Sequence, residues 1–132
     1  MRLNAELVGK AYPPVRIEVD PERVRAFAGA VSHPGGGVPP TFATVPEIVA
    51  GLGNVVRDPD LGVDIARVLH GDQEYRWERP IRVGDTLVAH ATIDSIRGKG
   101  ETEFLAIRTD IRDGSGELVV RARSTLIVRG DP

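Results

Sequence analysis

Three histidines are the first residues in this sequence that suggest chemistry, and His33 has the most unusual surroundings. It lies in the stretch SHPGGGVPPTF, residues 32–42, before three consecutive glycines and two prolines. An imidazole titrates near neutral pH, and a glycine loop can bring it to a ligand as a general base. A histidine before proline in an exposed turn is more often solvated, so His33 is a weak catalytic candidate. The glycines do not match the phosphate-binding patterns, which require a lysine or GxGxxG.

His70 and Asp72 form a second candidate pair, two residues apart in the alternating segment HGDQEYRW. Side chains two residues apart share a face of a regular strand, so we expect these two to lie together. The pair fits a catalytic dyad or a polar strand face at a dimer seam, and the structural role is favoured. A metal would require a third ligand, for which His90 is the only other histidine in the predicted strands. The sequence therefore predicts no metal site.

The composition indicates one folded domain over residues 1–132. The 17 basic and 19 acidic residues give a net charge of −2 and are interspersed, so we expect no binding of nucleic acid or of a membrane surface. The chain has no cysteine, which excludes disulfides and a cysteine nucleophile. No apolar run approaches the ~20 residues of a membrane span, and the first residues lack a signal-peptide core. We therefore expect a cytoplasmic protein.

Two helices and a short strand are predicted in the first half of the chain. Residues 15–19 alternate as a strand, and Asp20-Pro21-Glu22 is typical of a helix start. A second helix is predicted over residues 45–56, with Thr44 and Glu47 in a capping-box pattern. This helix is apolar nearly all round, so we expect it to be buried. Its glycines predict that another backbone packs closely against it.

The second half of the chain changes to a period of two, which is typical of strands. Four strands are predicted, over residues 67–78, 86–97, 103–112 and 118–129. The turns between them are short enough for an antiparallel meander. A short strand, two helices and four long strands give an α+β chain, in which a buried helix needs a sheet to wrap around it.

Three motifs stand in order along the chain: VPPTF at residues 38–42, HGDQ at 70–73 and RPIRVGD at 79–85. Together with the flanking segments they resemble the MaoC-like dehydratases of the hot-dog superfamily, in particular the actinobacterial HadA-type subunits of (3R)-hydroxyacyl-thioester dehydratase. The resemblance extends through nearly the whole chain. It implies a single hot-dog domain, with a five-stranded curved antiparallel sheet around a buried central helix. It also implies a homodimer or a heterodimer with a catalytic MaoC-like subunit.

The hydratase motif of that family has the form aspartate, any residue, asparagine, proline, any residue, histidine. Here His33 stands in the aspartate position, Gly35 in the asparagine position and Val38 in the histidine position. The segment that follows the motif in similar proteins is shortened here to a glycine loop. The resemblance therefore implies a subunit without the aspartate and histidine that move protons when water adds to a 2-enoyl thioester. It implies no cofactor.

An acyl-CoA or acyl-carrier-protein thioester is the ligand that the resemblance implies. The amides of Phe42 and Ala43, with Thr41 as a candidate cap, could stabilise the charge that gathers on the thioester carbonyl. The alternative is that VPPTF only turns the chain into the central helix.

Val49 and Leu52 are candidates for lining an acyl tunnel, beside Tyr75 and Trp77. In the predicted strand these two aromatic residues face away from His70. A place in the core or in a dimer interface is the commoner role for such aromatic side chains.

Three functions follow from these observations. The leading hypothesis is an accessory, tunnel-forming subunit whose partner supplies the catalytic pair. The second is a non-catalytic module that binds acyl thioesters or regulates another protein. The third is an acyl-CoA thioesterase in which Glu47 activates water, although the capping box explains Glu47 more simply.

Overall fold

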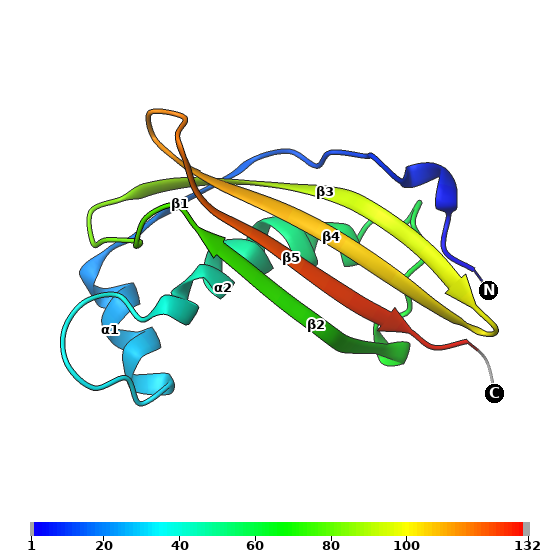
Figure 1. The fold of residues 1–132 in the computed structure, drawn as a ribbon, viewed down its shortest axis with the longest axis horizontal. Coiled ribbons are helices and arrows are strands. Elements are labelled where there is room, and N and C mark those ends of the chain that lie inside the picture. The colour runs from blue at the N-terminus through cyan, green and yellow to red at the C-terminus, as the bar shows by residue number, and fades with distance from the viewer. Residues whose placement is uncertain (1, 131–132) are drawn as a thin grey trace.

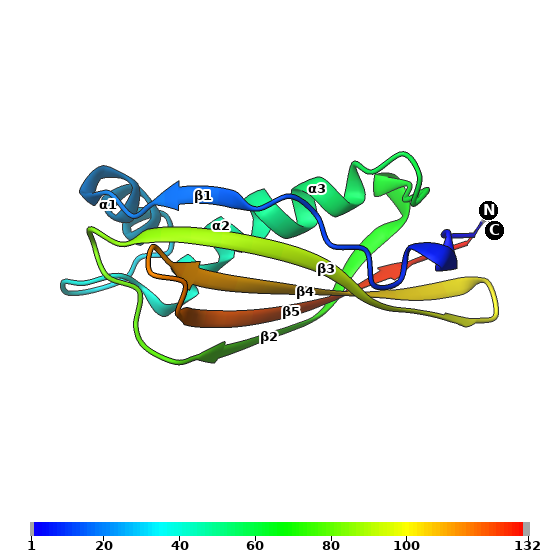
Figure 2. The ribbon, with the colours of Figure 1, turned by 90° about the horizontal axis from the view of Figure 1, so that it is seen from above.

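The computed structural model describes residues 2–130 and shows a five-stranded antiparallel sheet with helices on one face (Figures 1 and 2). The strand order is β1-β3-β4-β5-β2. The predicted α+β class is confirmed, and each strand ends within two residues of its predicted bounds. The strands are β1 Val15–Glu18, β2 Val68–Trp77, β3 Thr86–Lys99, β4 Thr102–Asp113 and β5 Leu118–Val128.

Strands β3, β4 and β5 form the predicted meander, but β2 does not join it. β2 pairs with β5, from Val68 opposite Val128 to Trp77 opposite Val120. The prediction of a four-stranded meander is therefore wrong at this point, because residues 78–85 lead from β2 across to β3 instead of closing a hairpin. As a result β1 and β2 are the two edge strands of the sheet.

The helix α1, Pro21–Ala30, begins where the sequence predicts it. The Asp20 side chain accepts a hydrogen bond from the Arg23 amide at 2.7 Å, and Pro21 occupies the start of the helix. Phe27 of α1 meets Phe42 edge-on, with 5.5 Å between the ring centroids. α1 therefore closes one end of the core beside the start of the next helical segment.

A continuous helical segment, Pro40–Val56, lies along the inner face of the sheet and is called the central helix below (Figure 2). It begins with a 3₁₀ turn, Pro40–Ala43, and continues through α2 Thr44–Glu47, a π segment Ile48–Leu52 and α3 Gly53–Val56. It starts five residues before the predicted helix, because Pro40 is well suited to the first turn. Neither this helix nor any other within residues 2–130 has the length and apolar character to cross a membrane.

Gly51 brings the π segment close to the sheet. A Cβ at this position would lie 2.5 Å from Thr109 Oγ1 and 3.6 Å from Ala91 Cβ. The predicted close approach is therefore present, but the neighbours are side chains of β4 and β3 and not another backbone.

The central helix is covered on one side only. Ala50 and Val55 are fully buried, whereas Ile48 and Val49 are each 47% exposed. The prediction of a helix buried all round is therefore wrong for the single chain. The sheet covers one face, and residues 2–130 leave the apolar side chains of the other face in contact with solvent.

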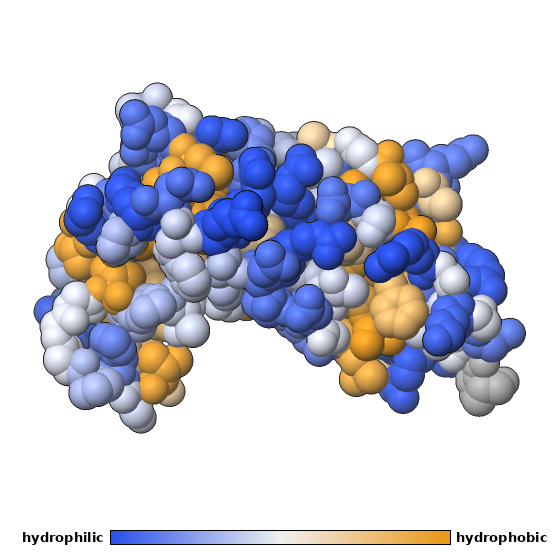
Figure 3. Space-filling view, in the orientation of Figure 1, coloured by the Kyte–Doolittle hydropathy of each residue, from blue (hydrophilic) through white to orange (hydrophobic). Residues whose placement is uncertain are grey.

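The opposite face of the sheet is polar. Arg108, Arg121 and Arg123 form ion pairs there with Asp94 and Asp110, at distances from 2.7 to 3.8 Å. Hydrophilic side chains cover the middle of this face (Figure 3). Surfaces suited to an apolar ligand therefore lie on the helix side.

Candidate functional site

The central helix meets the inner face of β2 along a line that we call the helix–β2 seam. One side of β2 pairs with β5, and the other side has no partner strand within residues 2–130. An unpaired edge strand beside exposed apolar side chains is a surface that proteins commonly cover. The side chains that β2 directs towards the seam are Val68, His70, Gln73, Tyr75 and Trp77.

A β-bulge at Gly71 decides which side chains of β2 face the seam. His70 is paired with Leu126, whose buried side chain points to the helix side, whereas Asp72 is paired with the next residue, Thr125. The extra residue reverses the alternation, so His70 faces the seam and Asp72 faces outward. The prediction that His70 and Asp72 share a face is therefore wrong, and no dyad forms between them.

A hydrogen-bonded cluster joins the central helix to β2 and β5 in the middle of the seam. Gln73 Nε2 donates to Glu47 Oε2 at 2.9 Å, and the Tyr75 hydroxyl donates to Glu47 Oε1 at 2.8 Å. The Ser124 hydroxyl lies 2.6 Å from Glu47 Oε2 and 2.7 Å from Gln73 Oε1. Thr44 Oγ1 lies 2.8 Å from the Tyr75 hydroxyl. We call these five residues the Glu47 cluster.

The capping-box prediction is wrong because Glu47 bonds to the sheet. Glu47 is 1% exposed, and no side chain caps the start of α2. The earlier candidate cap, Thr41, does not act as one, because Pro39 occupies the cap position of the 3₁₀ turn and no side chain bonds there. Buried polar groups need partners, and the Glu47 cluster provides them for this carboxyl group.

Tyr75 is held as a hydrogen-bond donor in this cluster. Burial raises the pKa of its hydroxyl above the ordinary value, and the nearby charge of Glu47 acts in the same direction. The hydroxyl therefore keeps its proton over the physiological pH range and donates a hydrogen bond to Glu47.

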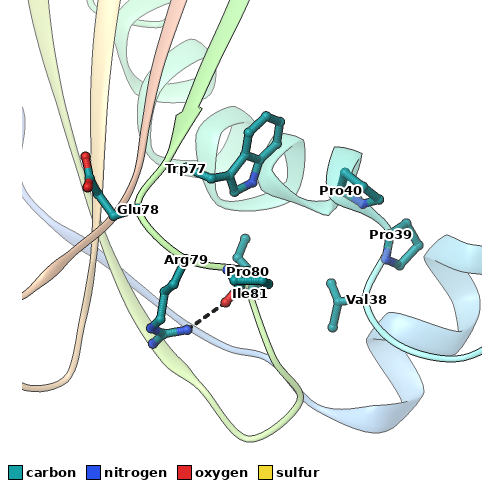
Figure 4. A pocket seen from close by; sticks show the side chains of 8 residues that line it. All are labelled: Val38, Pro39, Pro40, Trp77, Glu78, Arg79, Pro80 and Ile81. Carbon is teal, nitrogen blue, oxygen red and sulfur yellow. Dashed lines mark hydrogen bonds between the residues drawn. The ribbon is translucent and has the colours of Figure 1, made fainter.

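An apolar pocket lies at the end of the seam next to the start of the central helix (Figure 4). Its volume is about 460 Å³. The indole of Trp77 stands opposite the prolines at the helix start, and Trp77 is 41% exposed. We call it the Trp77 pocket; it is lined by Val38, Pro39, Pro40, Trp77, Glu78, Arg79, Pro80 and Ile81.

A second hollow of about 640 Å³ lies at the other end of the seam. Its wall is apolar apart from the side chains of His70 and Arg57. The side chain of Arg57 makes no hydrogen bond or ion pair within residues 2–130. We call it the His70 groove; it is lined by Ile48, Leu52, Gly53, Val56, Arg57, Val63, Ile65, Val68, His70 and Leu126.

Asp58 fixes the chain just after Arg57. Its Oδ2 accepts hydrogen bonds from Lys10 Nζ at 2.6 Å and from the Tyr12 hydroxyl at 2.7 Å. These bonds, that of Lys10 first, lower the pKa of Asp58 to about 2. The end of the central helix is thereby tied to the N-terminal segment, and Arg57 is placed at the groove.

The three residues predicted at the start of the central helix differ in their access to a ligand. The side chain of Thr41 is exposed, whereas Phe42 and Ala43 are fully buried. The Phe42 amide donates to the Pro39 carbonyl at 2.9 Å, so it is not free for a thioester carbonyl. Of these three, Thr41 is the residue whose side chain faces solvent.

Val49 and Leu52, the predicted tunnel residues, lie on the uncovered side of the central helix. Leu52 lines the His70 groove, and Val49 is exposed on the same helix without lining either hollow.

His33 lies away from His70. Its backbone amide donates to the Ala28 carbonyl at 2.9 Å in the turn after α1. That turn and the start of β2, which carries His70, lie at opposite ends of the molecule (Figures 1 and 2). In the part of the chain that the structure describes, no three His, Asp or Glu side chains are grouped to hold a metal ion.

The Glu47 cluster is the feature of the site that the predictions miss. The alternation of β2 already places Gln73 on the face of Tyr75 and Trp77. Glu47 is also the only acidic residue in an apolar helix, and such a residue needs buried polar partners. Those two signals together point to the cluster, but the capping-box interpretation gave Glu47 a local role.

Comparison with known proteins supports the fold and gives a family. Residues 32–122 match the family described as "FAS1-like, dehydratase domain region". A UPF0336 protein of Streptomyces coelicolor is 38% identical, over 98% of this chain and 97% of that protein. The alignment has 146 positions against 132 residues in this chain, so this relative has residues without a counterpart here.

Solved structures with the same fold include subunits of two-chain complexes. The chain matches a structure of the HadBC (3R-hydroxyacyl-ACP dehydratase) complex from Mycobacterium tuberculosis with a TM-score of 0.79 and 24% identity, over 92% of this chain and 96% of that one. It matches a MaoC-like dehydratase with a TM-score of 0.81 and 25% identity, over 94% of this chain and 42% of that one. The ChsH1-ChsH2 complex of Mycobacterium tuberculosis gives 0.70 and 14%, over 93% and 86%. These matches confirm the predicted hot-dog fold.

Proposed function

The chain belongs to the UPF0336 proteins and, over residues 32–122, to the FAS1-like dehydratase-region family, and from this premise we propose that it is an accessory subunit of a (3R)-hydroxyacyl-thioester dehydratase or enoyl-thioester hydratase. In this proposal its apolar seam binds the acyl chain of an acyl-CoA or acyl-carrier-protein thioester. A second hot-dog chain provides the aspartate and histidine that move the protons.

The uncovered helix–β2 seam is the observation that carries the proposal. Ile48, Val49 and Trp77 are 41 to 47% exposed beside an edge strand with no partner in residues 2–130. A second hot-dog chain would pair with that edge and cover these side chains, which removes apolar area from water. The similar HadBC and ChsH1-ChsH2 structures are complexes of two chains, which supports a partner of this type.

The candidate catalytic groups of this chain do not form an acid–base pair within residues 2–130. His33 follows α1 at the opposite end of the molecule from His70, and the bulge at Gly71 separates His70 from Asp72. In the proposal the His70 groove binds the acyl chain, with Leu52 and Arg57 in its wall, and the Arg57 guanidinium attracts the phosphate groups of the thioester carrier. Val49, exposed on the same helix as Leu52, contacts the thioester at the surface that the partner covers. Thr41 follows Pro40 of the Trp77 pocket and lies at the other end of the seam.

The thioesterase alternative requires Glu47 to activate a water molecule. Glu47 is 1% exposed, and hydrogen-bond donors from β2 and β5 already occupy its carboxyl oxygens. Its surroundings therefore leave no room for water and a thioester, and they disfavour this role.

The proposal is tested by affinity purification of the tagged protein from its native cells, followed by a hydration assay on 2-enoyl-CoA. We expect a stoichiometric hot-dog partner that has the aspartate and histidine pair. We expect turnover by the complex and none by this chain alone. Strong turnover by the isolated protein, abolished by His70→Ala or His33→Ala, would contradict the accessory role. A lone homodimer that binds acyl-CoA without turnover would support the binding-module alternative.

A further inference from the structure

We propose that Tyr75 is a specificity-determining residue: it forms the wall between the His70 groove and the Trp77 pocket and so limits the length of acyl chain that the groove accepts. The inference rests on the proposed function, because it takes the ligand of the groove to be an acyl chain. It adds to that function a residue that determines which lengths of acyl chain fit the groove.

The order of residues along β2 places Tyr75 between the two hollows. The groove includes Val68 and His70 at the start of the strand, and the pocket includes Trp77 at its end. Gln73 and Tyr75 are the seam-facing residues between them.

The order along the central helix agrees. The Trp77 pocket reaches as far as Pro40, and the His70 groove begins at Ile48. Between them stand Thr44 and Glu47, the two residues of the helix that bond to the Tyr75 hydroxyl. Hydrogen bonds therefore join the helix to the strand at Tyr75, and this point lies between the two hollows.

Tyr75 is a rigid wall because both its hydroxyl and its ring are held. The hydroxyl lies 2.8 Å from Glu47 Oε1 and 2.8 Å from Thr44 Oγ1. The ring centroid lies 5.3 Å from that of Trp77. Turning the ring aside would break two partly buried hydrogen bonds. Tyr75 stands just beyond the residues that line the groove, so an acyl chain that extends past them along the seam meets a fixed obstacle.

Both hollows suit the same apolar ligand. Their volumes, about 640 and 460 Å³, each fall within the range of about 300–1,000 Å³ that is usual for ligand sites. Replacing Tyr75 with a small side chain would join two apolar spaces along one seam. A chain that ends at Tyr75 in the wild-type protein would then extend towards Trp77.

The test measures the binding of a series of saturated acyl-CoAs of increasing chain length by isothermal titration calorimetry, with the purified full chain and with its complex. For the wild-type protein we expect the affinity to rise about fourfold with each added CH₂ group until the chain reaches Tyr75, and then to stay constant. For Tyr75→Ala we expect the rise to continue to longer chains. An unchanged cut-off in Tyr75→Ala would overturn the inference.

Two further variants keep the test decisive. Tyr75→Val opens the same wall with a residue that favours strands, and it replaces Tyr75→Ala if that variant does not fold. Arg76→Ala changes the next residue, which faces the opposite side of the sheet, and it should leave the cut-off unchanged. If the wild-type protein and its complex bind no acyl-CoA, the proposed function is wrong. If they bind with a cut-off that neither Tyr75 variant moves, only the present inference is wrong.

Discussion

The His70 groove and the Trp77 pocket lie on the same seam, between the same helix and the same strand, but they are built differently. The groove lies beside the π segment and α3, and it contains a histidine and an arginine. The pocket lies at the 3₁₀ turn, and three prolines restrict its backbone. The comparison indicates that the pocket is a stiff end of the seam, whereas the groove has the groups that can respond to a charged ligand.

The charged residues of the two hollows show the same difference. Arg79 of the Trp77 pocket lies 2.8 Å from Asp85 and 3.5 Å from Asp113, so its charge is used to fix the crossover from β2 to β3. Arg57 of the His70 groove has no such partner within residues 2–130. A guanidinium with unused donors beside an apolar wall suits an amphipathic anion, which favours the groove as the ligand site.

The largest effect on the seam is expected from Glu47→Ala, which removes the shared acceptor of the Glu47 cluster. Gln73, Tyr75 and Ser124 would lose their shared partner. Unpaired buried polar groups are costly, so we expect the free energy of unfolding to fall by about 3 kcal/mol. Urea denaturation followed by circular dichroism measures it. Glu74→Ala, at an exposed position on the opposite face of β2, is the matched control and should change stability by less than about 0.5 kcal/mol.

Glu47→Gln tests the same cluster through the number of hydrogen atoms that are available for its hydrogen bonds. Three contacts join Glu47 Oε2, the Gln73 amide and the Ser124 hydroxyl. The serine hydroxyl and the Gln73 amide supply two hydrogens for these contacts, and a carboxylate supplies none. In Glu47→Gln the new side-chain amide supplies the missing hydrogen once the Gln73 amide turns over, so that the Gln73 oxygen accepts from it and the Gln73 nitrogen donates to Ser124. We therefore expect the stability of this variant to lie within about 1 kcal/mol of wild type. A loss as large as that of Glu47→Ala would contradict this account of the cluster.

The next effect concerns the bulge that turns His70 into the groove. A Cβ at Gly71 would lie 2.7 Å from Ile127 Cδ1 and 3.3 Å from the Thr125 carbonyl oxygen. We therefore expect Gly71→Val to lower the free energy of unfolding by about 1–3 kcal/mol and to displace His70 from the groove wall. NMR titration of the His70 imidazole, with and without decanoyl-CoA, measures the second effect. A variant of wild-type stability in which His70 still responds to the ligand would contradict the role of the bulge.

The sequence predicts the elements of this fold better than it predicts the seam. The helix start at Asp20 and the period-two segments depend on neighbours in the chain, and the structure confirms them. The reversal at Gly71 depends on the pairing with Thr125 and Leu126 of β5, more than 50 residues later. The bonds of Glu47 depend on Gln73 and Tyr75 of β2, 26 and 28 residues later, and on Ser124 of β5, 77 residues later. A local pattern cannot show which distant strand becomes the neighbour. The predictions that the 67–78 strand joins the meander and that His70 and Asp72 share a face are therefore wrong.

A smaller effect is expected where Asp58 fixes the helix end beside the groove. Hydrogen bonds from Lys10 and Tyr12 lower the pKa of Asp58 to about 2, compared with 3.8 for a free side chain. The stability that these bonds provide is present above about pH 4 and is lost as the pH falls through about 2. We expect Asp58→Asn to unfold more easily by about 1–2 kcal/mol at pH 7 and by much less near pH 2. Thermal unfolding at a series of pH values measures this, and an equal difference at both ends would contradict it.

The smallest effect on stability is expected from Trp77→Ala, at the stiff end of the seam. Trp77 is 41% exposed and already partly in water, so its removal should lower the free energy of unfolding of the isolated chain by about 1 kcal/mol. The same indole stands on the surface that the proposed partner covers, and exposed tryptophans at interface centres contribute strongly to affinity. We therefore expect a loss of at least about tenfold in partner affinity, measured by surface plasmon resonance with the purified subunit. Val83→Ala, at an exposed apolar position outside both hollows, is the control for apolar area alone. If both variants bind the partner like wild type, the partner does not cover the Trp77 end of the seam. Any contact of the partner with the seam must then lie at the His70 groove.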